Sequence, residues 1–208
     1  VVVEENERKE IEASASSDSK PTINSRRYAI YDRFSGRCIY GKDENKETAM
    51  ASTTKIMSII IVVEKCNLSD TVTITAKVAG TGGSRLGLHT DDKITVIDLL
   101  YGLMLMSGND AAVALAIHTA GSIEQFADLM NQKAEELGLT NTHFVTPHGL
   151  DNPDHYTTAY ELAKITDYAL KNETIAKIVK TKTATINING SPMQINNTNE
   201  LLGNVDGV

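Results

Sequence analysis

Apolar and polar residues follow two different spacings along the chain. Near both ends they alternate in short runs, which is the period of a half-buried strand. Five runs are predicted to be strands on this basis: residues 27–32, 37–40, 71–75, 179–189 and 193–195. The turn at residues 33–36 joins the first two runs into a hairpin, and Gly190 joins the last two into another.

Between these runs, apolar residues recur at the spacing of buried or amphipathic helices. Helices are predicted at residues 96–106, 110–119, 122–137 and 158–171. The last two begin with capping boxes, Ser122-Ile-Glu-Gln125 and Thr158-Ala-Tyr-Glu161. Gly121 and Gly138 follow helices at the position where a left-handed residue commonly ends them.

The most apolar stretch, residues 56–63, allows two interpretations. Its β-branched residues at 59–63 favour a strand by propensity alone. Because residues 52–65 run for 14 positions without Gly or Pro, we expect a fully buried helix instead.

The order of elements is strands, then many helices, then strands again, which indicates an α+β fold or an α/β fold with a helical insertion. We expect an antiparallel sheet flanked by helices, with a mainly helical subdomain. Residues 1–25, rich in Glu, Ser, Lys and Asn, are expected to form a flexible, solvated tail before a domain at 26–208. Residues 201–208 resemble the approach to another strand, so the sheet is expected to need sequence beyond Val208.

Composition and charge limit the kinds of molecule that the protein is expected to bind. The 208 residues are 41% apolar, enough for a real core, and the net charge of −7 with no basic stripe argues against nucleic acid. The longest apolar run is far shorter than the roughly 20 residues that span a bilayer. No initiator Met or signal sequence opens the chain, which fits a mature form or one lacking its targeting segment. Cys38 and Cys66 permit one disulfide, but two small buried thiols are the simpler expectation.

Ser52 and Lys55 stand at the start of the apolar stretch and are the first candidates for chemistry. On a helix, residues three apart share a face, so the lysine nitrogen can reach the serine hydroxyl. An ordinary lysine is neutral in only about one molecule in 2,500 at pH 7, so burial would have to lower its pKa by about three for it to act as a base. The same Ser-x-x-Lys pattern occurs at Ser17 to Lys20 in the polar tail, so the pattern alone also allows a helix cap with a lysine that reaches solvent.

Ser107-Gly-Asn109 is a second candidate, because it interrupts two apolar helices with polar residues that are costly to bury without partners. A loop directed into a cleft would explain it, with Ser107 relaying a proton and Asn109 holding a substrate amide or Lys55. A helix–helix turn capped by Asn109 or Asp110 is the alternative, but it leaves Ser107 unexplained.

Together, Ser-Thr-Thr-Lys at 52–55 and Ser-Gly-Asn at 107–109 resemble the penicillin-recognising serine enzymes, whose signature is S-x-x-K, S-x-N and K-T-G. The closest resemblance is to the low-molecular-mass D-alanyl-D-alanine carboxypeptidases, which are penicillin-binding proteins. It runs in order through residues 28–32, 49–55, 82–86, 98–112, 148–151, 155–160 and 197–202.

The resemblance implies a role for each candidate. Ser52 is expected to be the nucleophile, Lys55 its proton acceptor, Ser107 a proton shuttle and Asn109 a substrate-binding residue. The implied substrates are peptidoglycan stem peptides ending in D-Ala-D-Ala, and β-lactams are expected to acylate the same serine. No metal or organic cofactor is implied. The expected location is the outer face of the bacterial cytoplasmic membrane, the cell wall or the periplasm, with any membrane anchor in a segment outside this chain.

One signature element is missing from the 208 residues. Lys180-Thr-Lys182 lacks the glycine of K-T-G and precedes its usual position, which in similar proteins directly follows a stretch like residues 205–208. The domain is therefore expected to be truncated before the K-T-G strand. That strand supplies a lysine for the substrate carboxylate and one of two oxyanion-hole N–H groups, the other coming from Ser52. We therefore expect the 208-residue chain by itself not to turn over substrate.

Other readings remain open. A non-catalytic β-lactam- or peptidoglycan-binding module would explain the missing element. A class A β-lactamase would need a deacylating glutamate on a loop, whereas Glu161 opens a predicted helix. The residues His143, His148, Asp151, Asp154 and His155 could suggest zinc, but their irregular loop favours surface or loop-fixing roles. Gly80-Thr-Gly-Gly-Ser84 lacks the Gly-Lys-Ser/Thr of a phosphate-binding loop.

Overall fold

The computed structural model describes residues 23–205 and begins with the predicted hairpin. Strands β1 (Tyr28–Asp32) and β2 (Arg37–Lys42) pair antiparallel, with a bulge between Ile30 and Tyr31. The hairpin packs on helix α7 (Ala159–Leu170) at one end of the molecule. Most of the predicted tail at 1–25, and residues 206–208, lie outside the described residues.

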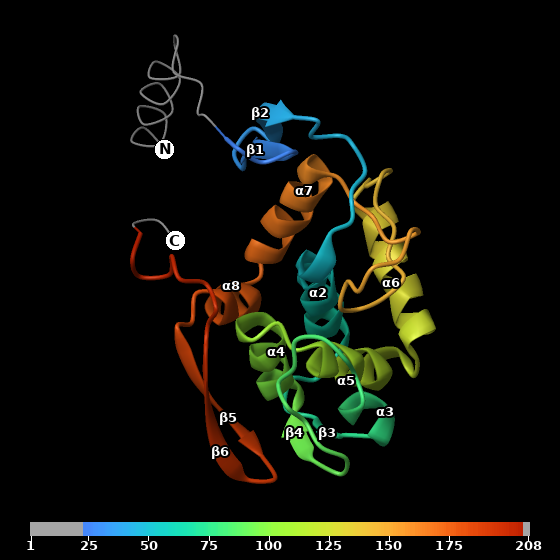
Figure 1. Ribbon diagram of the computed structural model, residues 1–208, viewed down its shortest axis with the longest axis vertical. Coiled ribbons are helices and arrows are strands. Elements are labelled where there is room, and N and C mark those ends of the chain that lie inside the picture. The colour runs from blue at the N-terminus through green and yellow to red at the C-terminus, as the bar shows by residue number, and fades with distance from the viewer. Residues whose placement is uncertain (1–22, 206–208) are drawn as a thin grey trace.

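Helices fill the middle of the molecule (Figure 1). The apolar stretch forms α2 (Lys55–Lys65), entered through the 3-10 turn η1 (Ala51–Thr54), so the helical interpretation is confirmed. Residues 59–62 of α2 are at most 1% exposed, because other helices surround it on several sides. Those around it are α4 (Val96–Leu105), α5 (Asn109–Ala120), α6 (Ile123–Glu136), α7 and α8 (Glu173–Val179).

A second sheet lies at the opposite end from the hairpin (Figure 1). It is antiparallel and joins β3 (Thr71–Thr73), β4 (Lys93–Thr95), β5 (Thr183–Ile188) and β6 (Ser191–Asn196) in that order. Its ladder is thin at the centre, where Ile94 of β4 pairs with Ile188 of β5. The α+β class with antiparallel sheets and flanking helices is confirmed.

Two strands are shorter than predicted, and three elements, α3, β4 and α8, were not predicted. The strand predicted at 71–75 ends at Thr73, because Thr75 accepts a hydrogen bond from the Val78 N–H and caps the short helix α3 (Ala76–Ala79). The strand predicted from 179 begins at Thr183, because Asn172 caps α8 and continues the chain as a helix to Val179. Strand β4 was not predicted.

In both predicted capping boxes, the hydrogen bond from the helix N–H to the capping hydroxyl is present. Ser122 Oγ accepts from the Gln125 N–H and Thr158 Oγ1 from the Glu161 N–H, both at 3.1 Å. The Glu161 carboxylate does not reach back to its own helix, because it accepts hydrogen bonds from the N–H groups of Thr140 and Asn141 instead. It therefore fastens the loop after α6 to the start of α7.

Both cysteines are free and half-buried, whereas full burial was expected. Cys66 Sγ lies 3.1 Å from Thr119 Oγ1. No helix within residues 23–205 combines the length and apolar character needed to cross a membrane.

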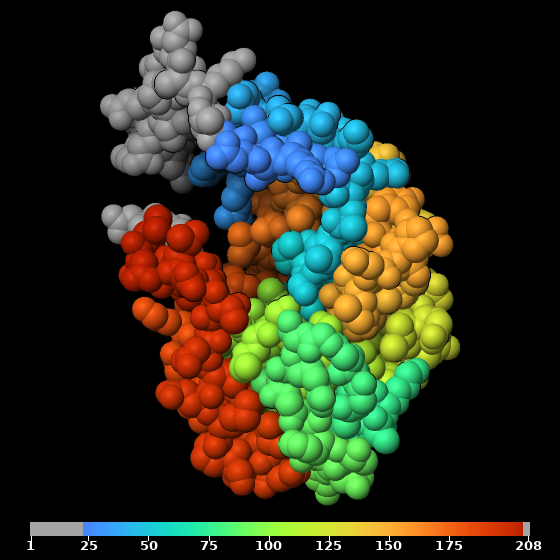
Figure 2. Space-filling model, viewed as in Figure 1, coloured from blue at the N-terminus to red at the C-terminus, as the bar shows by residue number. Residues whose placement is uncertain are grey.

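A groove of about 460 Å³ is lined by the first hairpin and α7, with Tyr31 and Arg33 on one side and Leu162 and Thr166 on the other. Figure 2 shows a hollow below the blue hairpin, with the orange-brown residues of α7 at its back. Arg33 Nε donates to Asp167 Oδ1 at 2.7 Å and joins the two sides.

Candidate active site

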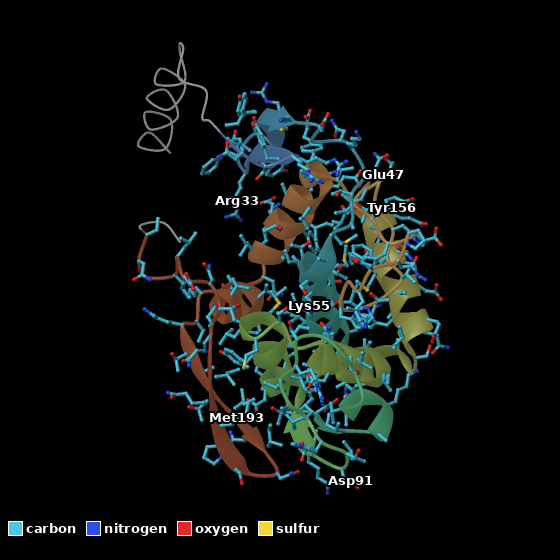
Figure 3. The ribbon with its side chains drawn as sticks, in the orientation of Figure 1. Arg33, Glu47, Lys55, Asp91, Tyr156 and Met193 are labelled. Atoms are coloured by element: carbon cyan, nitrogen blue, oxygen red, sulfur yellow. The ribbon has the colours of Figure 1, made fainter. Side chains whose placement is uncertain are left out.

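Ser52 and Lys55 meet at the start of α2, as predicted from their spacing. Lys55 Nζ lies 3.0 Å from Ser52 Oγ. Ser52 sits in η1 with its side chain exposed, whereas Lys55 is 2% exposed and lies in the middle of the molecule (Figure 3). The lysine therefore does not reach solvent, and the helix-cap alternative is wrong for Lys55.

The environment of Lys55 makes it a chemically useful amine. Burial lowers its pKa from 10.5 to about 8, because a charged ammonium loses its hydration there. Its Nζ also donates to Asn109 Oδ1 at 2.8 Å and to the His148 carbonyl at 3.0 Å. Three oxygens thus surround the amine, and one of them belongs to the serine that it could deprotonate.

Asn109 links this pair to the glycine-rich loop. Its Oδ1 accepts from Lys55, and its Nδ2 donates to the Gly82 carbonyl at 2.9 Å. A side chain at Gly83 would place its Cβ 2.4 Å from Asn109 Nδ2, so the loop needs glycine there to approach so closely. The predicted contact between Asn109 and Lys55 is therefore present, and the loop at 80–84 forms one wall of the site.

Asp110 is not a helix cap. Gly108 is the N-cap of α5 and makes no side-chain cap, so the capped-turn alternative for residues 107–110 is wrong. The fully buried Asp110 carboxylate accepts instead from the N–H groups of Leu86, Gly87 and Leu88, at 2.8 to 3.1 Å. It fixes the loop that follows the glycines.

Ser107 occupies a strained position beside the site. Its φ is +54°, in the left-handed region that residues with a side chain rarely adopt. Within the described part of the chain its hydroxyl makes no hydrogen bond to Ser52 or Lys55. The structure therefore brings Ser52, Lys55 and Asn109 together, and leaves the predicted relay through Ser107 without a direct contact.

The loop at 143–157 closes the other side of the site. His148 donates no proton to Lys55; its backbone carbonyl accepts from the amine. Burial, with the charge of Lys55 as a smaller cause, lowers the pKa of the His148 side chain to about 4. Gly149 has φ +85°, and a Cβ there would come within 1.8 Å of the Ala51 carbonyl oxygen. The loop and η1 are therefore in direct backbone contact.

The remaining candidates have other roles. His155 is 3% exposed and hydrogen-bonded to the loop, which fits the loop-fixing interpretation of the histidine cluster. No group of three His, Cys, Asp or Glu residues within 23–205 has the arrangement to hold a metal ion. The Glu161 carboxylate is occupied by residues 140–142.

This fold is that of the DD-peptidases, a class of serine hydrolases. The crystal structure of the Streptomyces K15 DD-transpeptidase superimposes with a TM-score of 0.84 at 37% identity, covering 91% of this chain and 79% of that one. The chain belongs to the D-alanyl-D-alanine carboxypeptidase family, peptidase S11, whose family model matches residues 14–208. The family resemblance seen in the sequence motifs is confirmed.

Curated relatives carry the same family name. D-alanyl-D-alanine carboxypeptidase DacF of Bacillus subtilis is 40% identical over 157 residues, which are 73% of this chain and 40% of that protein. D-alanyl-D-alanine carboxypeptidase of Streptomyces sp. strain K15 is 36% identical over 211 residues, covering 93% of this chain and 72% of that protein. The match thus spans less than half of DacF.

Several groups at the site could not be predicted from the sequence. The Gly82 carbonyl accepts from Asn109, and the His148 carbonyl accepts from Lys55. Every residue has a backbone carbonyl, so the residue type does not predict these contacts. The buried contact of Thr54 with His155 joins residues 101 positions apart. The one usable signal was the glycine content of the loops, at Gly82-Gly83 and at Gly149, which indicates close backbone approach.

Proposed function

We propose that this chain carries the active site of a serine D,D-carboxypeptidase that removes the terminal D-alanine from peptidoglycan stem peptides. The observation that carries the proposal is the buried Lys55 amine, 3.0 Å from the exposed Ser52 hydroxyl. A serine becomes a nucleophile when an adjacent base takes its proton, and a desolvated lysine is such a base.

In the proposed acylation step, neutral Lys55 takes the Ser52 proton while Ser52 Oγ attacks the carbonyl carbon of the penultimate D-alanine. A tetrahedral oxyanion forms and is stabilised by the Ser52 N–H, one of the first N–H groups of η1, which have no partner within their helix. The C–N bond then breaks, the amine of the terminal D-alanine gains a proton, and an ester remains on Ser52.

Ser107 is proposed to carry that proton to the leaving amine, and Asn109 to hold the substrate amide. Asn109 bonds both Lys55 and the Gly82 carbonyl, so one side chain positions the proposed base and the glycine-rich loop. Water then hydrolyses the ester, adding OH to the acyl carbon and returning the proton to Ser52. β-Lactams are proposed to acylate Ser52 in the same way, since their amide carbonyl presents the same chemistry.

We take residues 26–208 as one domain, preceded by the tail. The K-T-G element is proposed to lie beyond these residues. Lys180-Thr-Lys182 does not supply it, because these residues connect α8 to β5. The first hairpin supports the proposal, since Ile30 and Ile39 remain 37% and 62% exposed on β1 and β2. We further propose that the protein acts outside the cytoplasmic membrane, where stem peptides occur.

A non-catalytic β-lactam- or peptidoglycan-binding module is the second candidate, since Ser107 makes no hydrogen bond to Ser52 or Lys55 within the described residues. The two differ in turnover: a module would bind or be acylated without releasing D-alanine.

The test is release of D-alanine from a peptide ending in D-Ala-D-Ala, using this chain and the complete gene product in parallel. Ser52→Ala and Lys55→Met should abolish release, whereas Ser17→Ala, in the other Ser-x-x-Lys sequence, should leave it unchanged. Release that survives Ser52→Ala refutes the proposed mechanism. Acylation without release, by both chain lengths, favours the binding module.

A further inference from the structure

A chain of three hydrogen bonds ends on the residue just before Ser52. The Val145 N–H donates to His155 Nδ1 at 2.9 Å, and His155 Nε2 lies 2.7 Å from Thr54 Oγ1. Thr54 Oγ1 in turn donates to the Ala51 carbonyl at 2.7 Å. Thr54 is 0% and His155 3% exposed, so solvent does not compete for these bonds.

The positions of the protons follow from these partners. His155 Nδ1 accepts from a backbone N–H, so it carries no proton, and Nε2 must carry the one that the neutral ring has. Nε2–H therefore donates to Thr54, because the Thr54 proton is used on the Ala51 carbonyl. Burial lowers the pKa of His155 to about 4, which keeps the ring neutral at neutral pH.

The end point of this chain matters because of the geometry of a peptide. Ala51 has φ +46°, and its carbonyl is enclosed by Thr54 Oγ1 and by Gly149. In a planar trans peptide, the carbonyl of one residue and the N–H of the next point in opposite directions. Whatever holds the Ala51 carbonyl therefore also sets the direction of the Ser52 N–H, the proposed oxyanion donor.

We infer that His155 and Thr54 are positioning residues that aim the Ser52 N–H at the developing oxyanion by holding the Ala51 carbonyl. The inference rests on the proposed function and adds to it residues that touch neither substrate nor Ser52 Oγ. The loop at 143–157 thus contacts both the base and the turn η1 that carries Ser52. The carbonyl of His148 accepts from the Lys55 amine, and the ring of His155 bonds Thr54 in η1.

Two matched pairs of variants test the inference. Thr54→Ser keeps the hydroxyl, whereas Thr54→Val keeps the shape and removes it. His155→Gln can keep a donor near Thr54, whereas His155→Asn can keep only an acceptor for the Val145 N–H. The readouts are the first-order acylation constant with benzylpenicillin at saturation, its apparent affinity, and the affinity of an arylboronic acid, whose tetrahedral adduct needs the oxyanion donor.

We expect Thr54→Val and His155→Asn to lower the acylation constant by about tenfold to a hundredfold, below the 10²- to 10³-fold loss typical of deleting an oxyanion donor. Boronic acid affinity should fall in parallel, with little change in the apparent affinity for penicillin. Thr54→Ser and His155→Gln should retain most of both. A purely structural role would instead lower the fraction of active protein and leave the constants of that fraction unchanged.

Nitrogen NMR of the imidazole gives an independent readout in the unaltered chain, where His155 should be the Nε2–H tautomer. The inference is overturned if His155 is the Nδ1–H tautomer, or if Thr54→Val acylates within twofold of Thr54→Ser. Failure of the proposed function looks different: the wild-type protein itself is not acylated, and the inference falls with it.

Discussion

The lowered pKa of Lys55 predicts how acylation depends on pH. A lysine with a pKa of 10.5 is neutral in about 0.03% of molecules at pH 7, whereas one with a pKa of about 8 is neutral in about 10%. Burial therefore raises the amount of competent base at pH 7 by about 300-fold. Because the neutral amine is the active form, acylation should rise as pH rises through about 8 and be lost as pH falls below it.

The assay is the second-order rate of benzylpenicillin acylation of the complete gene product between pH 6 and pH 10. We expect a tenfold increase per pH unit on the acid side and a plateau above about 8. Lys55→Arg is the control, because a guanidinium stays protonated throughout this range and should show no such rise. A wild-type profile that is flat, or that keeps rising to pH 10 without a plateau, would contradict Lys55, with its lowered pKa, as the base.

The same pKa has a consequence for stability. The unfolded chain binds a proton at Lys55 up to about 10.5 and the folded chain only up to about 8, so the free energy of unfolding should rise with pH between these values. Lys55→Met should remove this slope in urea titrations at pH 8 and pH 10. An unchanged slope would show that Lys55 does not cause it.

Three further substitutions test particular contacts. Gly149→Ala should cost at least about 2 kcal/mol more stability in urea than Gly138→Ala, because both have positive φ but only the Cβ at 149 would strike a backbone carbonyl; equal costs would contradict the contact. Asn109→Leu should lower acylation at least tenfold and cost about 1–3 kcal/mol of stability, since one buried and one partly buried hydrogen bond lose a partner; unaltered kinetics would exclude Asn109 from the site. Glu161→Gln should cost about 1–3 kcal/mol of stability yet leave deacylation within about twofold, whereas a β-lactamase role for this carboxylate requires a large loss of deacylation.

Local patterns in the sequence predicted an element correctly where that element's own residues determine its structure. The uninterrupted apolar run of residues 56–63 predicted α2 correctly against its β-branched composition, because the helices around α2 bury most of its residues. The short helix α8 was missed, since seven residues show little periodicity and its start depends on Asn172 as a cap. The thin pairing of β4 with β5 depends on contacts distant in sequence, which no local pattern carries.

The residues of the candidate site likewise divide into those that local sequence predicts and those that tertiary contacts bring together. Ser52 and Lys55 could be paired from their spacing, and Asn109 could be placed near them because polar residues between apolar helices need a partner. The carbonyl groups that complete the lysine environment come from loops at 82 and 148, and a loop's path is set by tertiary contacts. The alternative in which Asp110 caps the helix was wrong, since its carboxylate accepts hydrogen bonds from three N–H groups more than 20 residues away.

The most direct test of the account is the intact mass of the protein after incubation with benzylpenicillin. Wild-type protein should gain the mass of one penicillin, and Ser52→Ala should gain none, while Ser17→Ala should behave like wild type. The measurement should be made on the 208-residue chain and on a chain extended past Val208, so that a need for the proposed K-T-G element is visible as a difference between them. An adduct that persists in Ser52→Ala, or no adduct in either wild-type form, would contradict Ser52 as the nucleophile.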